Sequence, residues 1–228
     1  MRFYKLPGGY RLGTIKNLAP IQGNLLEALL AGRSWRLMTA LLTRRLSNRV
    51  GPSDPEMIRC EDADYVLRCT VAAERSAHCP RGLLYYRALD NTMSTKRSAQ
   101  AHRSMVKERL ATEKYALELL PPERARPKLA RACASWAVMF YQEGAPEHGK
   151  FWAERVRVHD PAYSPEGIGP LAALAYRLGG FQLWGLETRL SKAAWSLAGR
   201  VWGLVRKPRT VPSLPLATDA LLCFVNQR

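Results

Sequence analysis

Three carboxylates that could perform acid–base chemistry stand together in the first half of the chain. Glu61 and Asp62 are adjacent, and Asp64 follows after one residue. A carboxylate within hydrogen-bond reach of a hydroxyl can take its proton and so turn it into a nucleophile. The pair opens a stretch with helical periodicity, where free backbone N–H groups stabilise an ionised carboxylate. Acidic residues in a first helical turn are also common as caps, and without its sequence context the pair would indicate simple capping.

Basic and aromatic residues on both sides of this pair could contact a substrate. Arg44 and Arg45 follow an apolar run and could bind a phosphate, although an exposed basic pair is often only solvated. Tyr85, Tyr86 and Arg87 end a short apolar segment downstream of the pair. The five cysteines contain no C-x-x-C and the four histidines are scattered, so no zinc spacing is present. We expect free, buried thiols in a reducing compartment.

The net charge of +16 favours a polyanionic partner but does not choose among nucleic acid, anionic lipid and nucleotide phosphate. Residues 1–94 hold 14 Lys/Arg against 8 Asp/Glu, and residues 95–228 hold 21 against 11, so the excess is spread along the chain. No recognised nucleic-acid motif is present, and we do not expect a nucleic-acid partner. The sequence shows neither a secretory signal nor a run of 18 apolar residues, which predicts a cytoplasmic location.

Short elements of both types are expected upstream of residue 95. Asn24 is placed to cap a helix over 25–31 that Gly32 ends. The apolar run 34–43 predicts a buried strand, 44–50 a short helix or turn, and 61–73 a helix. Residues 77–80 and 83–87 are expected to form short strands.

Helical periodicity dominates after residue 95. It predicts helices over 98–120, 128–142, 147–159 and 183–205, the first with Val106, Leu110, Leu117 and Leu120 on its buried face. The phrase Glu-Gly-Ala-Pro-Glu-His-Gly-Lys, followed later by Asp-Pro, looks like one tetratricopeptide-type helical hairpin. We therefore predict two regions, 1–94 and a helical 95–228.

The order of features between residues 20 and 94 resembles the family 2 glycosyltransferases of the GT-A fold. An apolar run ends in Arg44-Arg45, and Val50-Gly51 and Asp54-Pro55-Glu56 form a turn. A helix then opens as Glu-Asp-x-Asp-x-x-x-Arg and a short strand ends in Tyr-Arg. The resemblance implies an α+β fold, a partial GT-A-like α/β layer followed by an all-helical tail with the single hairpin.

The resemblance also implies an activity and roles for residues. Asp62 would be the general base of an inverting transfer from a nucleotide sugar to a hydroxyl of a glycan or lipid-linked acceptor. Glu61 would orient the site or contact the acceptor. Arg44, Arg45, Asp64 and Arg87 are candidates for substrate binding, with a purely structural role as the alternative for Asp64.

Two departures from the family pattern limit this expectation. No Asp-x-Asp precedes the acidic pair, and the residues before position 20 are too few to build a nucleotide-binding sheet. The second departure follows the Tyr-Arg: many members of the family carry a histidine there, whereas residues 88–94 contain none. We therefore expect a chain without its donor-binding half, inactive unless that half is supplied in trans. We expect no cofactor in this chain and a divalent Mg or Mn ion only in a complete enzyme.

The last expected helix carries a possible membrane contact. Trp195 and Trp202 fall at the edge of an apolar arc with basic residues opposite, a pattern of helices lying on an anionic membrane surface. Packing of the helix on its own domain is the alternative. Two other functions remain open, a non-catalytic helical interaction module and a basic nucleic-acid-binding protein.

Overall fold

The computed structural model describes residues 2–6, 9–12, 23–32, 37, 40–77, 86–88 and 97–205, with side chains for 23–32, 37, 40–77, 97–191 and 194. The described elements, in chain order, are β1 (Arg2–Leu6), β2 (Gly9–Leu12), α1 (Leu25–Leu30), α2 (Arg44–Val50), α3 (Glu61–Ala72), β3 (Tyr86–Ala88), α4 (Ala99–Leu119), α5 (Pro122–Gln142), α6 (Pro146–His159) and α7 (Pro170–Val205). No helix within these ranges is long and apolar enough to cross a membrane.

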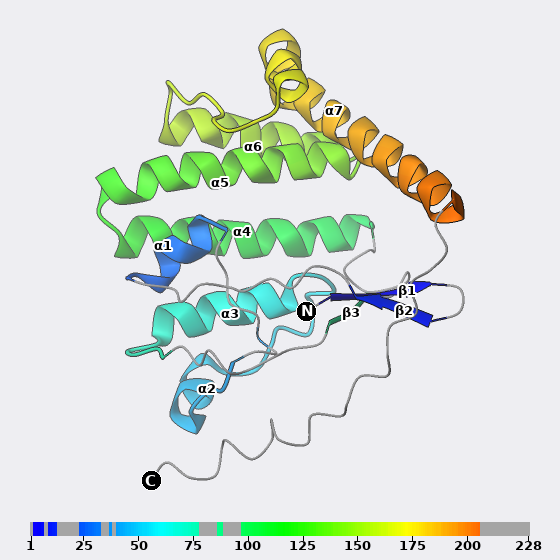
Figure 1. Ribbon diagram of the computed structural model, residues 1–228. Helices are drawn as coiled ribbons and strands as arrows, with labels where there is room; N and C mark the ends of the chain where they lie inside the picture. Colours follow the sequence, from blue (N-terminus) through cyan, green and yellow to red (C-terminus); the bar gives the residue numbers. More distant parts are fainter. Residues whose placement is uncertain are drawn as a thin grey trace.

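Helices make up the body of the molecule. α3, α4, α5 and α6 lie side by side in chain order, with α2 beyond α3 and α1 against α3, α4 and α5 (Figure 1). α7 packs on α5 and α6. It consists of two helical segments that meet at Gly179 and Gly180, where the backbone leaves the helical conformation.

The predicted α+β fold with a GT-A-like layer is wrong for the described residues. The strand expected over 34–43 does not form where the chain is described: residues 40–43 belong to no strand, and Leu41 is 79% exposed. Thr43 instead caps α2, accepting a hydrogen bond from the N–H of Leu46 at 3.2 Å. Because an exposed run that leads into a helix cap cannot also be a buried strand, the body is helical from α1 onward.

The small sheet that is described differs from the predicted layer. β1 lies between β2 and β3, antiparallel to β2 and parallel to β3, with Phe3 opposite Leu12 and Arg2 opposite Tyr86. Of the strands expected over 77–80 and 83–87, only Tyr86 and Arg87 fall in a described strand. Ala77 lies outside any strand, and residues 78–85 lie outside the described part of the chain.

Local signals for the helix starts and ends are confirmed. Asn24 caps α1 by accepting hydrogen bonds from the N–H groups of Leu26 and Glu27, at 2.9 and 3.2 Å. Gly32 follows α1 with φ of +72°, a conformation that favours glycine. Ser98 caps α4 through a 3.1 Å hydrogen bond from the N–H of Ala101. The helices expected over 98–120, 128–142 and 147–159 correspond to α4, α5 and α6.

Two apolar clusters hold these helices together. One joins α5, α6 and α7 around Phe140, Trp152 and Phe181, and Met105 from α4 reaches into it. The other joins α1, α3, α4 and α5 around Leu67 and Leu129. α5 contributes to both clusters, so it is the central helix of the body.

The buried face of α4 differs from the predicted one. Leu110 and Leu117 are exposed, although Leu120 is buried as expected. The face turned toward the neighbouring helices carries small and polar side chains instead: Ala101, Ser104, Met105, Glu108, Arg109, Thr112, Glu113 and Ala116. Ion pairs and hydrogen bonds therefore replace part of the expected leucine contact.

Candidate functional site at the start of helix α3

The loop between α2 and α3 is fixed before it reaches the acidic pair. Gly51 ends α2 with φ of +75°. The N–H of Glu56 donates to Asp54 Oδ1 at 2.9 Å, and Lys107 of α4 binds the other carboxylate oxygen. The hydrogen bond from Lys107 lowers the pKa of the Asp54 carboxyl. Met57 belongs to the same loop and is buried. The middle of the loop is therefore held by packing as well as by the contact with Lys107.

An ion pair anchors the last residues of this loop. The guanidinium of Arg59 donates two hydrogen bonds of 2.7 Å to the carboxylate of Glu143, at the end of α5. His102 of α4 lies 3.2 Å from the same carboxylate. Burial alone would raise the pKa of Glu143, but these partners outweigh it and the pKa is lowered. Residues of two helices, α4 and α5, thus fix the position of Arg59.

Cys60 turns the chain into α3 with an unusual backbone conformation. Its φ of 64° is the only positive value found at a non-glycine residue in the described part of the chain, and such values are uncommon outside glycine. Its carbonyl accepts the N–H of Asp64 at 2.9 Å, the first hydrogen bond of the helix. Burial raises the pKa of its thiol, so Cys60 is poorly suited to act as a nucleophile.

Glu61 and Asp62 follow at the first two positions of α3, as predicted. Asp62 is exposed, and its Oδ1 accepts a hydrogen bond from the N–H of Ala63 at 2.8 Å. Within the described residues neither carboxylate of the pair forms an ion pair. The carboxylate of Asp62 therefore lies at a helix N-terminus and faces solvent.

Asp64 has a structural partner. Its carboxylate accepts a 2.8 Å hydrogen bond from Nε of Arg68 one turn later. The same guanidinium donates to the carbonyls of Val50 and Pro52, at 2.6 and 3.1 Å. Asp64 and Arg68 together clamp α3 to the end of α2, which favours the structural role for Asp64 over substrate binding.

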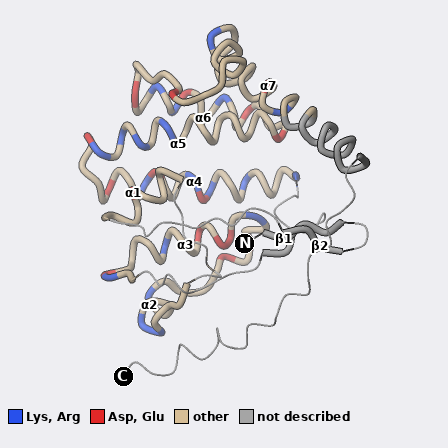
Figure 2. The backbone as a smooth tube through the Cα atoms, in the orientation of Figure 1, with Lys and Arg blue, Asp and Glu red and all other residues tan. Residues whose placement is uncertain are grey.

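A polar layer on α4 lies beneath the start of α3. Thr112 donates to Glu108 at 3.0 Å, and the guanidinium of Arg109 lies 3.4 Å from the same carboxylate. Burial raises the pKa of Glu108, and the nearby charges of Asp64 and Asp62 raise it further. Figure 2 shows that both acidic and basic residues occur along α3 and α4.

The predicted basic residues are not brought to the acidic pair. Arg45 pairs with Glu74 at 2.8 Å, just beyond the C-terminal end of α3, and Arg49 joins the same carboxylate. At 1.5 Å per residue the twelve residues of α3 span about 18 Å. Arg44 is exposed on the neighbouring position of α2. Arg87 lies in β3 and Trp195 and Trp202 lie in α7, but the structure does not describe their side chains.

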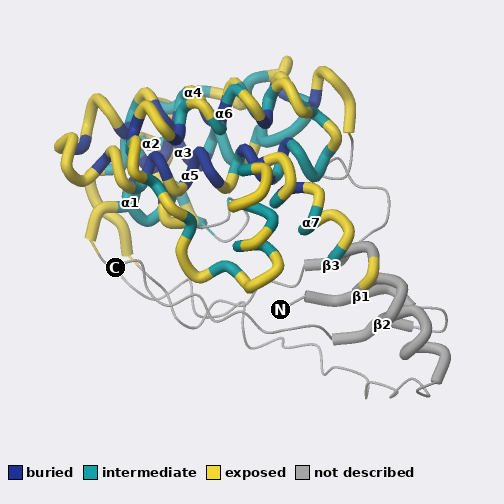
Figure 3. Tube along the Cα trace, turned by 90° about the horizontal axis from the view of Figure 1, so that it is seen from above, coloured by how far each residue is buried: buried dark blue, intermediate teal, exposed yellow. Residues whose placement is uncertain are grey.

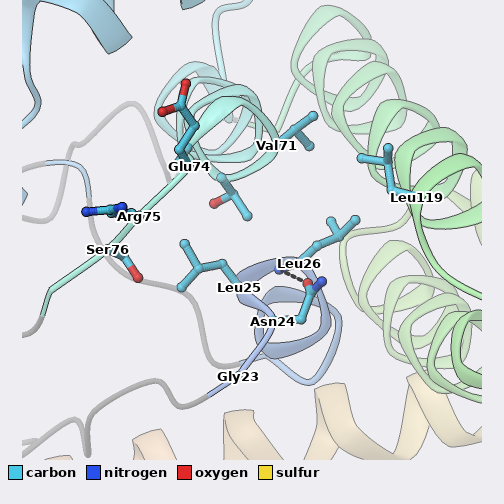
Figure 4. A pocket seen from close by; sticks show the side chains of 11 residues that line it. Gly23, Asn24, Leu25, Leu26, Val71, Glu74, Arg75, Ser76 and Leu119 are labelled. Carbon is cyan, nitrogen blue, oxygen red and sulfur yellow. Dashed lines mark hydrogen bonds between the residues drawn. The ribbon is translucent and has the colours of Figure 1, made fainter.

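Two hollows flank α3. A pocket of about 280 Å³ lies between α1 and the C-terminal end of α3, with Asn24, Thr70, Glu74 and Arg75 in its lining (Figure 4). An open hollow of about 590 Å³ lies between α2 and the first half of α3. It is lined by Ser47, Asn48, Gly51, Pro52, Ser53 and Tyr65. Tyr65 stands three residues after Asp62 and on the same side of the helix, although neither Glu61 nor Asp62 belongs to the lining of this hollow.

The residues around the acidic pair do not fit a divalent metal ion. Asp54 and Asp64 are already paired with Lys107 and Arg68. No group of three or more His, Cys, Asp or Glu that could hold a metal is found among the described residues. Cys69 and Cys133 are free and buried and Cys60 is free and partly buried, as predicted, while Cys79 and Cys223 lie outside the described residues.

Comparisons of the chain with protein-family models, with curated proteins and with solved structures found no match.

Sequence reasoning missed the residues that support the acidic pair. Arg59 and Glu143 are 84 residues apart, and Glu108 and Arg109 lie on a buried face of α4 other than the leucine face that was expected to be buried. One signal was present: Ala101, Met105, Thr112 and Ala116 repeat at helical spacing with the two charged residues between them. A helical stripe of uncharged residues that also contains charged residues indicates a buried polar contact.

Proposed function

We propose that the chain supplies the acceptor side of an inverting glycosyltransferase, with Asp62 as the general base. The observation that carries the proposal is that the carboxylates around α3 differ in whether they form ion pairs. Asp54 and Asp64 are each paired with a basic side chain, whereas Asp62 is exposed at a helix N-terminus and forms no ion pair with a described residue. The family is proposed from the resemblance of residues 20–94 to the family 2 glycosyltransferases.

In the proposed reaction Asp62 accepts one proton. The acceptor hydroxyl attacks the anomeric carbon of the nucleotide sugar, a new C–O bond forms, and the bond to the nucleoside diphosphate breaks. The hydroxyl proton passes to the Asp62 carboxylate, and the diphosphate leaves with the electrons of the broken bond. Donor binding lies outside the described site, and no step is assigned to a metal.

The hollow between α2 and α3 suits a sugar acceptor. Its lining offers the side-chain amide of Asn48 and the hydroxyls of Ser47, Ser53 and Tyr65. The Ser47 and Tyr65 hydroxyls lie 3.2 Å apart and can exchange their mutual hydrogen bond for bonds to a ligand. Polar groups of this kind fix the orientation of a sugar, and an aromatic ring supplies apolar contact. Glu61, four residues before Tyr65, is placed to contact the same acceptor.

The test replaces Asp62 and measures sugar transfer. The chain is combined with a separately produced GT-A donor half and assayed with labelled nucleotide sugars and glycan acceptors. Asp62→Asn should keep the helical circular dichroism spectrum and lower turnover by about two to four orders of magnitude, the usual contribution of a positioned general base. Near-normal turnover by this variant would remove Asp62 from its role.

A matched control separates catalysis from helix stabilisation. Glu123 is likewise an exposed acidic residue in the first turn of a helix, α5. Glu123→Gln should leave turnover unchanged while costing a similar fraction of helix stability. If both variants lower transfer equally, the acidic pair of α3 acts only as a cap.

A second candidate function is a non-catalytic helical interaction module. It is favoured by the exposed Leu110 and Leu117, which lie seven residues apart on one side of α4, because apolar side chains that gather on a surface indicate a partner. Sugar transfer that depends on Asp62 would contradict this alternative.

A further inference from the structure

The second segment of α7 has a row of leucines on its outer face. Leu183, Leu186 and Leu190 are 38%, 47% and 61% exposed. Their spacing of three and four residues places them on one side of the helix. Figure 3 shows α7 at the edge of the helical body with long exposed stretches. The same spacing continues in the sequence to Leu197, Val201 and Leu204, and the backbone remains helical to Val205.

Packing on the opposite side fixes the direction of this row. Phe181 is buried and Trp184 packs against the core cluster. Gly185 allows α7 to approach α5 so closely that an added Cβ would come within 2.4 Å of Tyr141 Cβ. At about 100° per residue, the three leucines lie roughly 150–170° from the centre of this packed face. The leucine row therefore points away from the body and cannot be covered by α5 or α6.

The charge of this part of the chain indicates what covers the row. Residues 170–209 contain seven Lys or Arg and one acidic residue, Glu187. Arg177 and Arg189 are exposed. A second copy of the chain would bring two stretches of the same strong positive charge together. A surface of anionic lipid offers both an apolar layer for the leucines and negative headgroups for the basic residues.

We propose that α7 binds an anionic phospholipid surface through the row formed by Leu183, Leu186 and Leu190. The helix lies on the bilayer with these leucines in the acyl boundary and the basic residues at the headgroups. This differs from the contact expected from the sequence, which used Trp195 and Trp202. Both tryptophans fall near the side of the helix occupied by Trp184, since 11 and 18 residues correspond to nearly whole turns. The inference does not depend on the proposed glycosyl transfer.

Flotation with lipid vesicles tests the proposal on the whole chain. Vesicles of phosphatidylcholine and phosphatidylserine in equal parts should carry the protein at low salt. Binding should weaken as salt is added, because the attraction to headgroups is screened. The triple variant Leu183→Gln, Leu186→Gln, Leu190→Gln should bind about tenfold more weakly or worse, since three apolar side chains no longer enter the bilayer.

The chain offers a closely matched control. Leu110, Leu117 and Leu119 of α4 are 38%, 46% and 54% exposed, nearly the values of the α7 row. Glutamine at these three positions should leave vesicle binding unchanged. Methionine at the three α7 positions should keep both the fold and the binding, so a loss caused by glutamine alone reflects polarity and not unfolding.

Four outcomes would overturn the proposal. Three come from flotation: the protein does not bind at low salt, it binds pure phosphatidylcholine vesicles as well as the mixed ones, or the α4 and α7 glutamine variants lose binding to the same extent. The fourth comes from sedimentation velocity: an oligomer that the α7 variant converts to a monomer would make the row an interface between copies of the chain.

Discussion

At the scale of single residues, buried ion pairs link distant parts of the chain. Glu113 of α4 is almost fully buried and accepts hydrogen bonds from Nε of Arg155 at 2.9 and 2.7 Å. His159 approaches the same carboxylate at 2.6 Å. Arg155 and His159 are 42 and 46 residues away, both on α6. Nothing in the local sequence around Glu113 indicates partners at such separations, so periodicity alone could not predict this contact.

Replacing Glu113 should therefore cost stability in a pH-dependent way. Burial would raise the pKa of this carboxyl, but the hydrogen bonds from His159 and Arg155 outweigh it and lower the pKa. A lowered pKa in the folded state means that the carboxylate stabilises the fold above its unfolded pKa of about 4.3. That stabilisation is lost as the pH falls through the folded value. Glu113→Gln should lower the free energy of unfolding by about 2–4 kcal/mol at neutral pH.

Urea denaturation at several pH values measures this effect. The difference between wild type and Glu113→Gln should shrink as the pH falls below about 4. Glu118→Gln, on the exposed side of the same helix, should stay within about 0.5 kcal/mol of wild type. A constant difference at every pH would show that Glu113 acts through packing and not through its charge.

At the scale of secondary-structure elements, the sequence predicts where helices begin and end better than it predicts which side of a helix is buried. Asn24, Gly32 and Ser98 mark helix boundaries because capping is a local interaction within a few residues. The strand expected over 34–43 and the leucine face expected for α4 failed because both depend on which element packs opposite. Arg109 shows this directly: its guanidinium lies over the rings of Trp136 and Phe140 on α5, at 5.6 Å from each centroid. The aromatic rings of α5 thus bury a face of α4 that the spacing of apolar residues does not predict.

A glycine on α7 tests how closely two elements must approach. In Gly185→Ala the new Cβ would meet Tyr141 Cβ at 2.4 Å and the carbonyl oxygen of Val138 at 3.3 Å. These atoms belong to the start of a side chain and to the backbone of α5, so they cannot move aside cheaply. The overpacking cost should exceed the helix-propensity gain of alanine, for a net loss of about 1–2 kcal/mol.

Thermal unfolding compares this variant with a control on the same helix. Gln182→Ala alters an exposed position three residues away and should change the free energy of unfolding by no more than about 0.5 kcal/mol. A Gly185→Ala variant as stable as wild type would mean that α7 does not pack on α5 at this distance. The leucine row on its outer face would then lose its fixed direction.

At the scale of the whole molecule, helices from both sides of residue 95 share one core. Leu26 and Leu67 pack in the same cluster as Ala116 and Leu129. The predicted division into 1–94 and 95–228 remains a prediction, and in the described residues the packing joins helices of the two regions. This packing also positions the loop before the acidic pair, because Arg59 and Asp54 of the loop are held by residues of α5 and α4. The candidate site could be located from its local motif, but its support required the assembled helices.

The last prediction concerns what this assembly binds by itself. A nucleoside diphosphate sugar needs a metal ion held by carboxylates or a cradle of backbone N–H groups. Before Asp54 the sequence has a single acidic residue, Glu27, and its carboxylate is paired with Arg124 and Lys128 of α5. Isothermal titration calorimetry with UDP-glucose, with and without manganese, should therefore show no tight binding. Addition of a GT-A donor half should restore binding and transfer together. Micromolar binding by the chain alone would contradict the proposed division of labour, because the residues that hold the donor would then lie within this chain.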